Sequence, residues 1–144
     1  MKKILFFISL AMLTIGSTSA QIQTTHTHEE TITLYGPKAG VSLHRMTFKD
    51  EYEYYIQLRT SNQFDKPMLL LLGNKTKTIQ SLEGLLNGFE LDKTSTMREG
   101  TGKEFIAIGA SILGADGYYI KMSGYAGYAY IRLSDFRKML KVIQ

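Results

Sequence analysis

Apolar and polar side chains alternate along several stretches of the chain, and this period of two predicts β-strands. In residues 52–59 every second side chain is apolar or aromatic, as at Ile56 and Leu58. Side chains of a strand point alternately to its two faces, so such a stretch has one core face and one solvent face. Residues 68–72 are a short unbroken apolar run between turn residues, which favours a buried strand. The pattern predicts strands at 31–35, 41–49, 52–59, 68–72, 104–113, 118–122 and 125–133.

Two other stretches carry apolar residues at the spacing of an amphipathic helix. The first helix is expected to start at a capping threonine, Thr76 or Thr78, and to end near Gly88. The second is expected to start at Ser134, with Asp135 near its positive end. The apolar positions are Ile79, Leu82, Leu85, Leu86 and Phe89 in the first helix, and Phe136, Met139, Leu140 and Ile143 in the second. Each helix therefore has one face that must be covered.

These elements predict an α+β fold, an antiparallel β-sheet with the two amphipathic helices packed on one face. A second arrangement stays open, in which the chain has two β-rich halves, each closed by a helix. Residues 54–58 and 118–122 match in type at each position, and both precede one strand and a helix. The polar segment 92–103 is expected to be the longest internal loop. The expected core is Ile56, Leu58, Leu70, Leu82, Leu86, Ile106, Ile108, Ile120, Ile131, Phe136 and Leu140.

The beginning of the chain has the three parts of a secretory signal peptide. Lys2 and Lys3 precede an apolar run at 4–15, and small residues follow at 16–20. The run is too short for a helix that crosses roughly 30 Å of hydrocarbon. A short basic start is typical of bacterial signals, so we expect export to the periplasm or the medium. The expected parts are a cleaved signal at 1–20, a flexible polar leader at 21–30 and a single globular domain at 31–144.

Composition narrows the class of protein further. Cysteine is absent, which excludes disulfides, thiol catalysis and the acylated cysteine of a lipoprotein. Of the 17 Lys and Arg residues, Lys2 and Lys3 lie in the signal, and the other 15 are interspersed with 13 Asp and Glu. Nucleic-acid binding needs clustered basic side chains, so this distribution argues against a nucleic-acid partner.

The tyrosines and arginines of the predicted strands are the strongest candidates for a binding surface. A tyrosine ring supplies rigid apolar area, and its hydroxyl or a neighbouring guanidinium keeps hydrogen bonds, so both residue types are enriched at interfaces. If the apolar sides of the strands face inward, one set of side chains shares the open face. These are Tyr55, Arg59, Tyr119, Lys121, Tyr128, Tyr130 and Arg132. A plain solvent-facing sheet would use the same residues for cross-strand pairs.

The leading hypothesis is a small exported non-catalytic binding or inhibitor-like module whose partner is a protein or a cell-envelope polymer. No motif for a nucleophile, a phosphate loop or a cofactor is present, so we name no catalytic residue and no cofactor. An enzyme whose carboxylates or tyrosines meet only in the fold stays open as an alternative. So does a metal-scavenging protein that uses the leader segment 26–30, because His26 and His28 would share one side of an extended leader and the carboxylates of Glu29 and Glu30 can add oxygen ligands.

Overall fold

The computed structural model describes residues 30–48 and 50–144. The predicted signal peptide and nearly all of the predicted leader, with His26 and His28, lie outside these residues.

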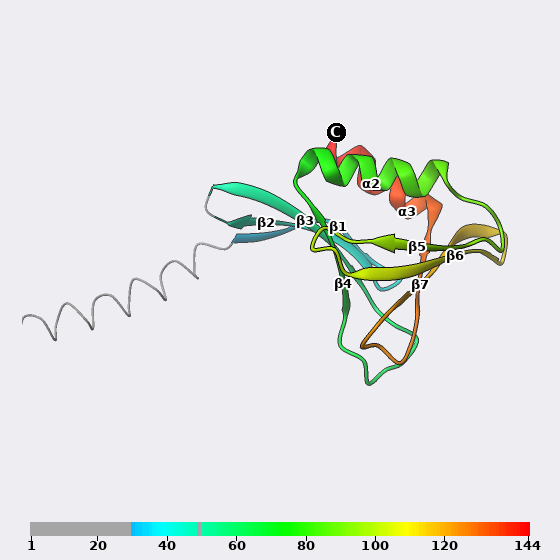
Figure 1. Cartoon of the computed structure of the whole chain (residues 1–144). Coiled ribbons are helices and arrows are strands. Elements are labelled where there is room, and N and C mark those ends of the chain that lie inside the picture. The colour runs from blue at the N-terminus through cyan, green and yellow to red at the C-terminus, as the bar shows by residue number, and fades with distance from the viewer. Residues whose placement is uncertain (1–29, 49) are drawn as a thin grey trace, which may run out of the picture.

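The described chain repeats one order of elements, four strands followed by a helix (Figure 1). The first set is β1 (Glu30–Lys38), β2 (Val41–Phe48), β3 (Glu51–Leu58), β4 (Met68–Gly73) and α2 (Lys75–Asn87). The second set is β5 (Thr94–Arg98), β6 (Glu104–Ile112), β7 (Ala115–Met122), β8 (Ala129–Arg132) and α3 (Leu133–Ile143).

The strands form two antiparallel sheets, in the orders β1-β2-β3-β4 and β5-β6-β7-β8. The predicted α+β class with antiparallel strands and two helices is confirmed, but two sheets take the place of the one expected. The open alternative, two β-rich halves each closed by a helix, describes this order of elements. Residues 54–58 lie in β3 and 118–122 in β7, the third strand of each sheet. Both segments bury the first, third and fifth of their five side chains.

The helices join the two halves. α2 and α3 pack against each other, and Figure 1 shows them side by side. α3 contacts β1 of the first sheet as well as β7 and β8 of the second. α2 contacts β3 and β4 of the first sheet, and its Leu85 carbonyl accepts a hydrogen bond of 2.7 Å from the Tyr118 hydroxyl on β7. The core therefore lies where the helices meet both sheets.

Most of the predicted core is confirmed. Leu86 and Leu140 are half-buried against it, and Ile108 is half-buried as well. The fully confirmed positions are Ile56, Leu58, Leu70, Leu82, Ile120, Ile131 and Phe136.

Ile106 and Ile108 are the exceptions, because both lie on the outward face of β6: Ile106 is 39% exposed, and Ile108 is not among the residues that form the core or pack against it. β6 carries apolar side chains on both faces, so its sequence does not decide which face turns inward. Phe105 and Ala107 take the inward positions, since they pair with the buried residues Met122 and Ile120 of β7. The predictions for Ile106 and Ile108 were wrong by one residue of register, and such a shift exchanges the two faces of a strand.

The predicted loop at 92–103 was also wrong in part, because β5 occupies Thr94–Arg98. Its one strongly apolar residue, Met97, packs against the core, and a single such position gives no visible period. The helix starts differ slightly from the prediction. α2 is capped by Asn74, whose Oδ1 accepts a 3.0 Å hydrogen bond from the Lys77 N–H. α3 begins at Leu133.

Candidate functional site

Three of the predicted partner-binding residues form one aromatic cluster on the second sheet. Tyr119 comes from β7, Tyr130 from β8 and Tyr128 from the loop just before β8. The Tyr119 ring centroid lies 4.9 Å from that of Tyr128 and 5.2 Å from that of Tyr130. At these separations aromatic rings attract each other. We call these three residues the tyrosine cluster.

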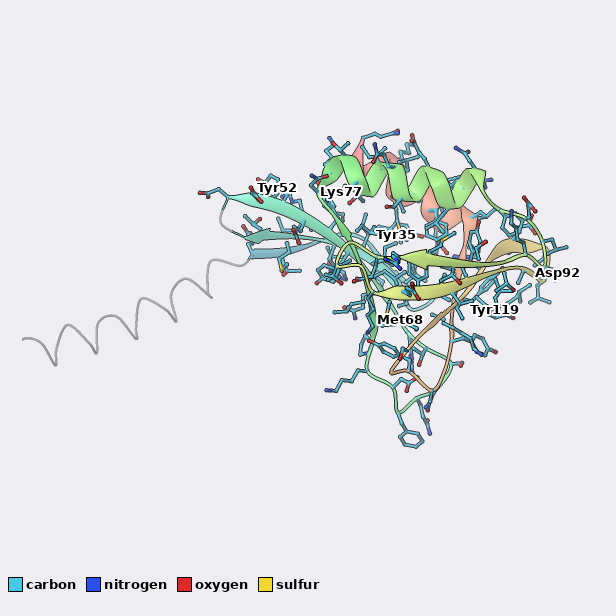
Figure 2. The ribbon with its side chains drawn as sticks, in the orientation of Figure 1. Tyr35, Tyr52, Met68, Lys77, Asp92 and Tyr119 are labelled. Atoms are coloured by element: carbon cyan, nitrogen blue, oxygen red, sulfur yellow. The ribbon has the colours of Figure 1, made fainter. Side chains whose placement is uncertain are left out.

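The tyrosine cluster faces away from α2. Tyr118 points its hydroxyl at α2, and the next residue of a strand points to the opposite face. Figure 2 shows Tyr119 on the side of the strands away from α2. Within the cluster, the Tyr130 hydroxyl donates to the carbonyl of Ala115. Burial raises the pKa of Tyr130 above its usual value.

Both predicted arginines, Arg59 and Arg132, line a groove of about 710 Å³ together with Tyr128 and Tyr130 of the cluster. We call it the tyrosine groove. It lies where the end of β3 meets β8. Arg59 is exposed there, and Tyr128 is 42% exposed. The lining includes Arg59, Thr60, Ser61, Tyr128, Tyr130 and Arg132. The fold thus brings four of the seven predicted residues to one groove, with Tyr119 packed beside two of them.

Tyr55 and Lys121 lie elsewhere. Tyr55 is on the outer face of the first sheet, where its ring stacks on His44 with a centroid distance of 4.9 Å. Lys121 is opposite Ile106 on the second sheet and lines a separate hollow of about 510 Å³. Whether either residue contacts a partner stays a prediction.

Asp65 joins the two loops beside the tyrosine groove. Its carboxylate accepts hydrogen bonds from the N–H of Gly127 at 2.8 Å and of Ala126 at 3.2 Å. It also accepts the Thr60 hydroxyl at 2.9 Å. The bond from Gly127 contributes most to holding the pKa of Asp65 below its usual range. A charged Asp65 therefore fastens loop 123–128, between β7 and β8, to loop 59–67, between β3 and β4.

Backbone hydrogen bonds strengthen this junction. Ser61 N–H donates to the Tyr128 carbonyl at 2.7 Å, and Tyr128 N–H donates to the Ser61 hydroxyl at 3.1 Å. Gly127 is needed where the loops meet, because a Cβ atom there would lie 2.6 Å from the backbone nitrogen of Asn62. The two loops are preorganised by these contacts, which reduces the ordering that binding would require.

Phe64 stands on the first of these loops and is 87% exposed. Its N–H donates to Asn62 Oδ1 at 3.1 Å, a local turn that fixes the backbone below the ring. Phe64 was not among the residues predicted to bind a partner. A lone aromatic residue in the polar stretch 60–67 was the available signal, since it belongs to neither a strand nor a helix pattern. An exposed aromatic ring on a fixed loop is a typical anchor for a partner.

Arg132 also has a structural role, because it binds Asp135 at the start of α3. Its guanidinium donates to both oxygens of Asp135 at 3.1 Å, and the Tyr35 hydroxyl donates to the same carboxylate at 2.7 Å. Burial opposes the ionisation of Asp135, yet the bonds from Arg132 and Tyr35 hold its pKa below the usual value. Burial, followed by the bond to Asp135, raises the pKa of Tyr35 to about 12. This group ties β1 to the start of α3.

Within the part of the chain that the structure describes, Ser42 and His44 form a hydroxyl–imidazole pair that resembles a nucleophile and its base. The Ser42 hydroxyl lies 2.8 Å from Nε2 of His44, and the Thr33 hydroxyl lies 3.1 Å from its Nδ1. Ser42 is only 4% exposed, and burial lowers the pKa of His44. A nucleophile must reach its substrate, and a triad histidine is normally oriented by a carboxylate. This geometry therefore gives no reason to assign a catalytic role.

The metal alternative rests on segment 26–30, of which only Glu30, at the start of β1, lies within the described residues; His26 and His28 lie outside them. Within residues 30–48 and 50–144, no group of three or more His, Asp or Glu is placed to hold a metal ion. None of the helices in this part of the chain has the length and hydrophobicity to span a membrane.

Comparisons with models of known protein families, with curated proteins and with solved structures gave no match.

Proposed function

We propose that this protein is an exported, non-catalytic binding or inhibitor-like module whose partner is a protein or a cell-envelope polymer. One observation carries the proposal: two hydrogen-bonded loops line the tyrosine groove with Thr60, Ser61 and Tyr128, and the first of these loops also holds the exposed Phe64. Aromatic side chains on a preorganised backbone bury large apolar area with little loss of conformational freedom.

The chemistry of the groove and its loops fits a partner with both apolar and polar groups. Phe64 offers only an apolar ring, whereas Tyr128 offers a ring with a hydroxyl. Arg59 is exposed in the groove and adds a positive charge that can hold a carboxylate or a carbonyl. Inhibitor-like binding is favoured by the loop itself, because a loop fixed by internal hydrogen bonds can enter a partner's cleft without rearranging.

Partner capture tests the proposal. Phe64→Ala and Tyr128→Ala should each weaken capture of the partner from an envelope extract, because exposed aromatic anchors carry much of an interface's free energy. Neither change should move the thermal midpoint by more than a few degrees, since exposed substitutions alter stability little.

Tyr52→Ala is the matched control. Tyr52 is 49% exposed, close to the 42% of Tyr128, and it lies on the β2–β3 hairpin away from the loops (Figure 2). Capture that is reduced equally by Tyr52→Ala and Tyr128→Ala would contradict the proposal, as would capture that neither Phe64→Ala nor Tyr128→Ala reduces.

Export is part of the proposal and depends on residues 1–20. N-terminal sequencing of protein recovered outside the cytoplasm should begin at Gln21, since small residues precede it at the cleavage site. Recovery of that protein with Met1 still attached would refute a cleaved signal.

A further inference from the structure

A third hollow lies under α2 and shares no lining residue with the tyrosine groove. It has a volume of about 570 Å³ and is bordered by α2, β4 and β5. Most of its exposed surface is apolar, and the lining includes Leu70, Leu72, Leu85, Met97 and Phe105. Small-molecule sites have this size and this mainly apolar character. We call it the α2 cavity.

Gly84 lines the α2 cavity from the middle of the helix. Glycine weakens a helix interior relative to alanine, so a glycine there normally has a packing reason. Gly109 in strand β6 shows what such a packing reason looks like, because a Cβ atom there would lie 2.0 Å from the Glu90 carbonyl oxygen. A Cβ atom at Gly84 would meet nothing within 4 Å. No neighbour in the described chain explains the glycine, whereas a ligand that lies across the helix would.

The charges at the cavity indicate which ligand would fit. The one carboxylate in its lining, Glu99, is buried and accepts hydrogen bonds from Leu71 N–H at 2.9 Å and Thr101 N–H at 3.2 Å. Arg98 is paired with Glu104 at 2.9 Å. Lys77 is exposed in the first turn of α2, and no ion pair joins it to a carboxylate of the described residues (Figure 2). The cavity thus offers an apolar floor and one free ammonium group.

We propose that the α2 cavity binds the free carboxylate form of a single-chain amphiphile, that is, a fatty acid. The alkyl chain lies on the apolar lining and passes over Gly84, and the carboxylate pairs with Lys77. This site shares no lining residue with the tyrosine groove. The two proposals therefore stand or fall separately.

Calorimetric titration of the purified protein with dodecanoate, below the concentration at which it forms micelles, tests the site. Saturable binding to one site is expected. Gly84→Leu should weaken binding about tenfold or more, because its side chain would occupy the ligand's path. Lys77→Glu should weaken binding about fivefold, because a repulsion replaces the attraction between Lys77 and the carboxylate. Dodecanol should bind less tightly than dodecanoate, because it has no charge for Lys77 to attract.

Each variant has a control on the same helix. Glu83→Leu adds the same side chain one residue earlier, and Lys75→Glu reverses a charge two residues earlier. Both positions are exposed, and neither lines the cavity. Both controls should bind dodecanoate as the unchanged protein does. The proposal is overturned if dodecanoate does not bind saturably, if Gly84→Leu keeps full affinity, or if each control is weakened as much as its counterpart.

A measurement on the unchanged protein guards against a misfolded variant. Dodecanoate should shift the NMR resonances of Met97 and Leu85 in the cavity and leave those of loop 59–67 in place. The reverse pattern would refute the site and would point to the tyrosine groove instead.

Discussion

Asp135 is a buried carboxylate whose hydrogen bonds offset the cost of removing its charge from water. It is only 1% exposed, and its carboxylate stays ionised because Arg132 and Tyr35 both donate hydrogen bonds to it. The same contacts bring β1, the end of β8 and the start of α3 together. Loss of the Tyr35 hydroxyl should therefore lower the stability of the whole fold.

Tyr35→Phe removes one donor from this buried carboxylate and should lower the free energy of unfolding by about 1–3 kcal/mol at neutral pH. The pKa of Tyr35 is raised from 10.0 to about 12, so its contribution is present below pH 10 and is lost as the pH rises through 12. Denaturant unfolding of both proteins should show a difference that shrinks toward pH 12.

Tyr55→Phe, on the outer face of the first sheet, is the matched control and should change stability little. A difference between Tyr35→Phe and the unchanged protein that persists undiminished above pH 12 would show that the hydroxyl bond is not its source.

The elements owe their positions to different kinds of contact. α2 and α3 are held by apolar faces, with Leu82 fully buried and Leu140 half-buried. The loops at 59–67 and 123–128 bury little and are held by hydrogen bonds to Asp65. Helix mutations should therefore change global stability, whereas loop mutations should change local order.

For the helices, Leu82→Ala should cost about 2–5 kcal/mol, because it removes a fully buried side chain and leaves a cavity. Leu140→Ala should cost less, since its neighbours cover it only in part. Equilibrium unfolding in denaturant measures both. The reverse order would mean that α3, not α2, makes the tighter contact at these positions.

For the loops, Asp65→Ala should expose the chain to cleavage by chymotrypsin after Phe64, because the loop loses the bonds that hold it. Asp116→Ala, an exposed aspartate outside these loops, is the control and should leave the cleavage rate unchanged. Equal rates in Asp65→Ala and in the unchanged protein would argue against a hydrogen-bonded junction.

Acid should loosen the same loops. The pKa of Asp65 is lowered from 3.8, so its stabilising bonds are present above pH 3.8 and are lost as the pH falls through the lower, folded-state value. NMR resonances of Gly127 should move over that range in the unchanged protein. Their position in Asp65→Asn should not follow the same titration.

At the scale of the whole molecule, the sequence pattern predicted individual strands and helices better than it predicted how they pair and pack. The similarity of residues 54–58 and 118–122 indicated the repeated order, because equivalent strands face equivalent surroundings. Two sheets could not be distinguished from one, since strand periodicity does not say which strands pair.

Of the candidate site, the tyrosine cluster was predicted from the shared face of its residues on the expected strands, although Tyr128 lies in the loop before β8 and Tyr55 and Lys121 lie elsewhere. The bonds of Asp65 were not predicted, because a contact across 62 residues leaves no local trace. Phe64 was missed although a lone aromatic residue in a polar stretch was a local signal, because it belongs to no strand or helix pattern.

Because the order of four strands and a helix occurs twice in succession, the chain can be cut between the two sets of elements. Each set is continuous, and the connection at 88–93 joins the two. The bonds from Tyr118 to Leu85 and from Tyr35 to Asp135 cross between the sets, as does the packing of α2 on α3. A cut in this connection would give two fragments with uncovered apolar faces, each needing the other to fold. Mixed as separate chains, the two fragments are expected to fold only together.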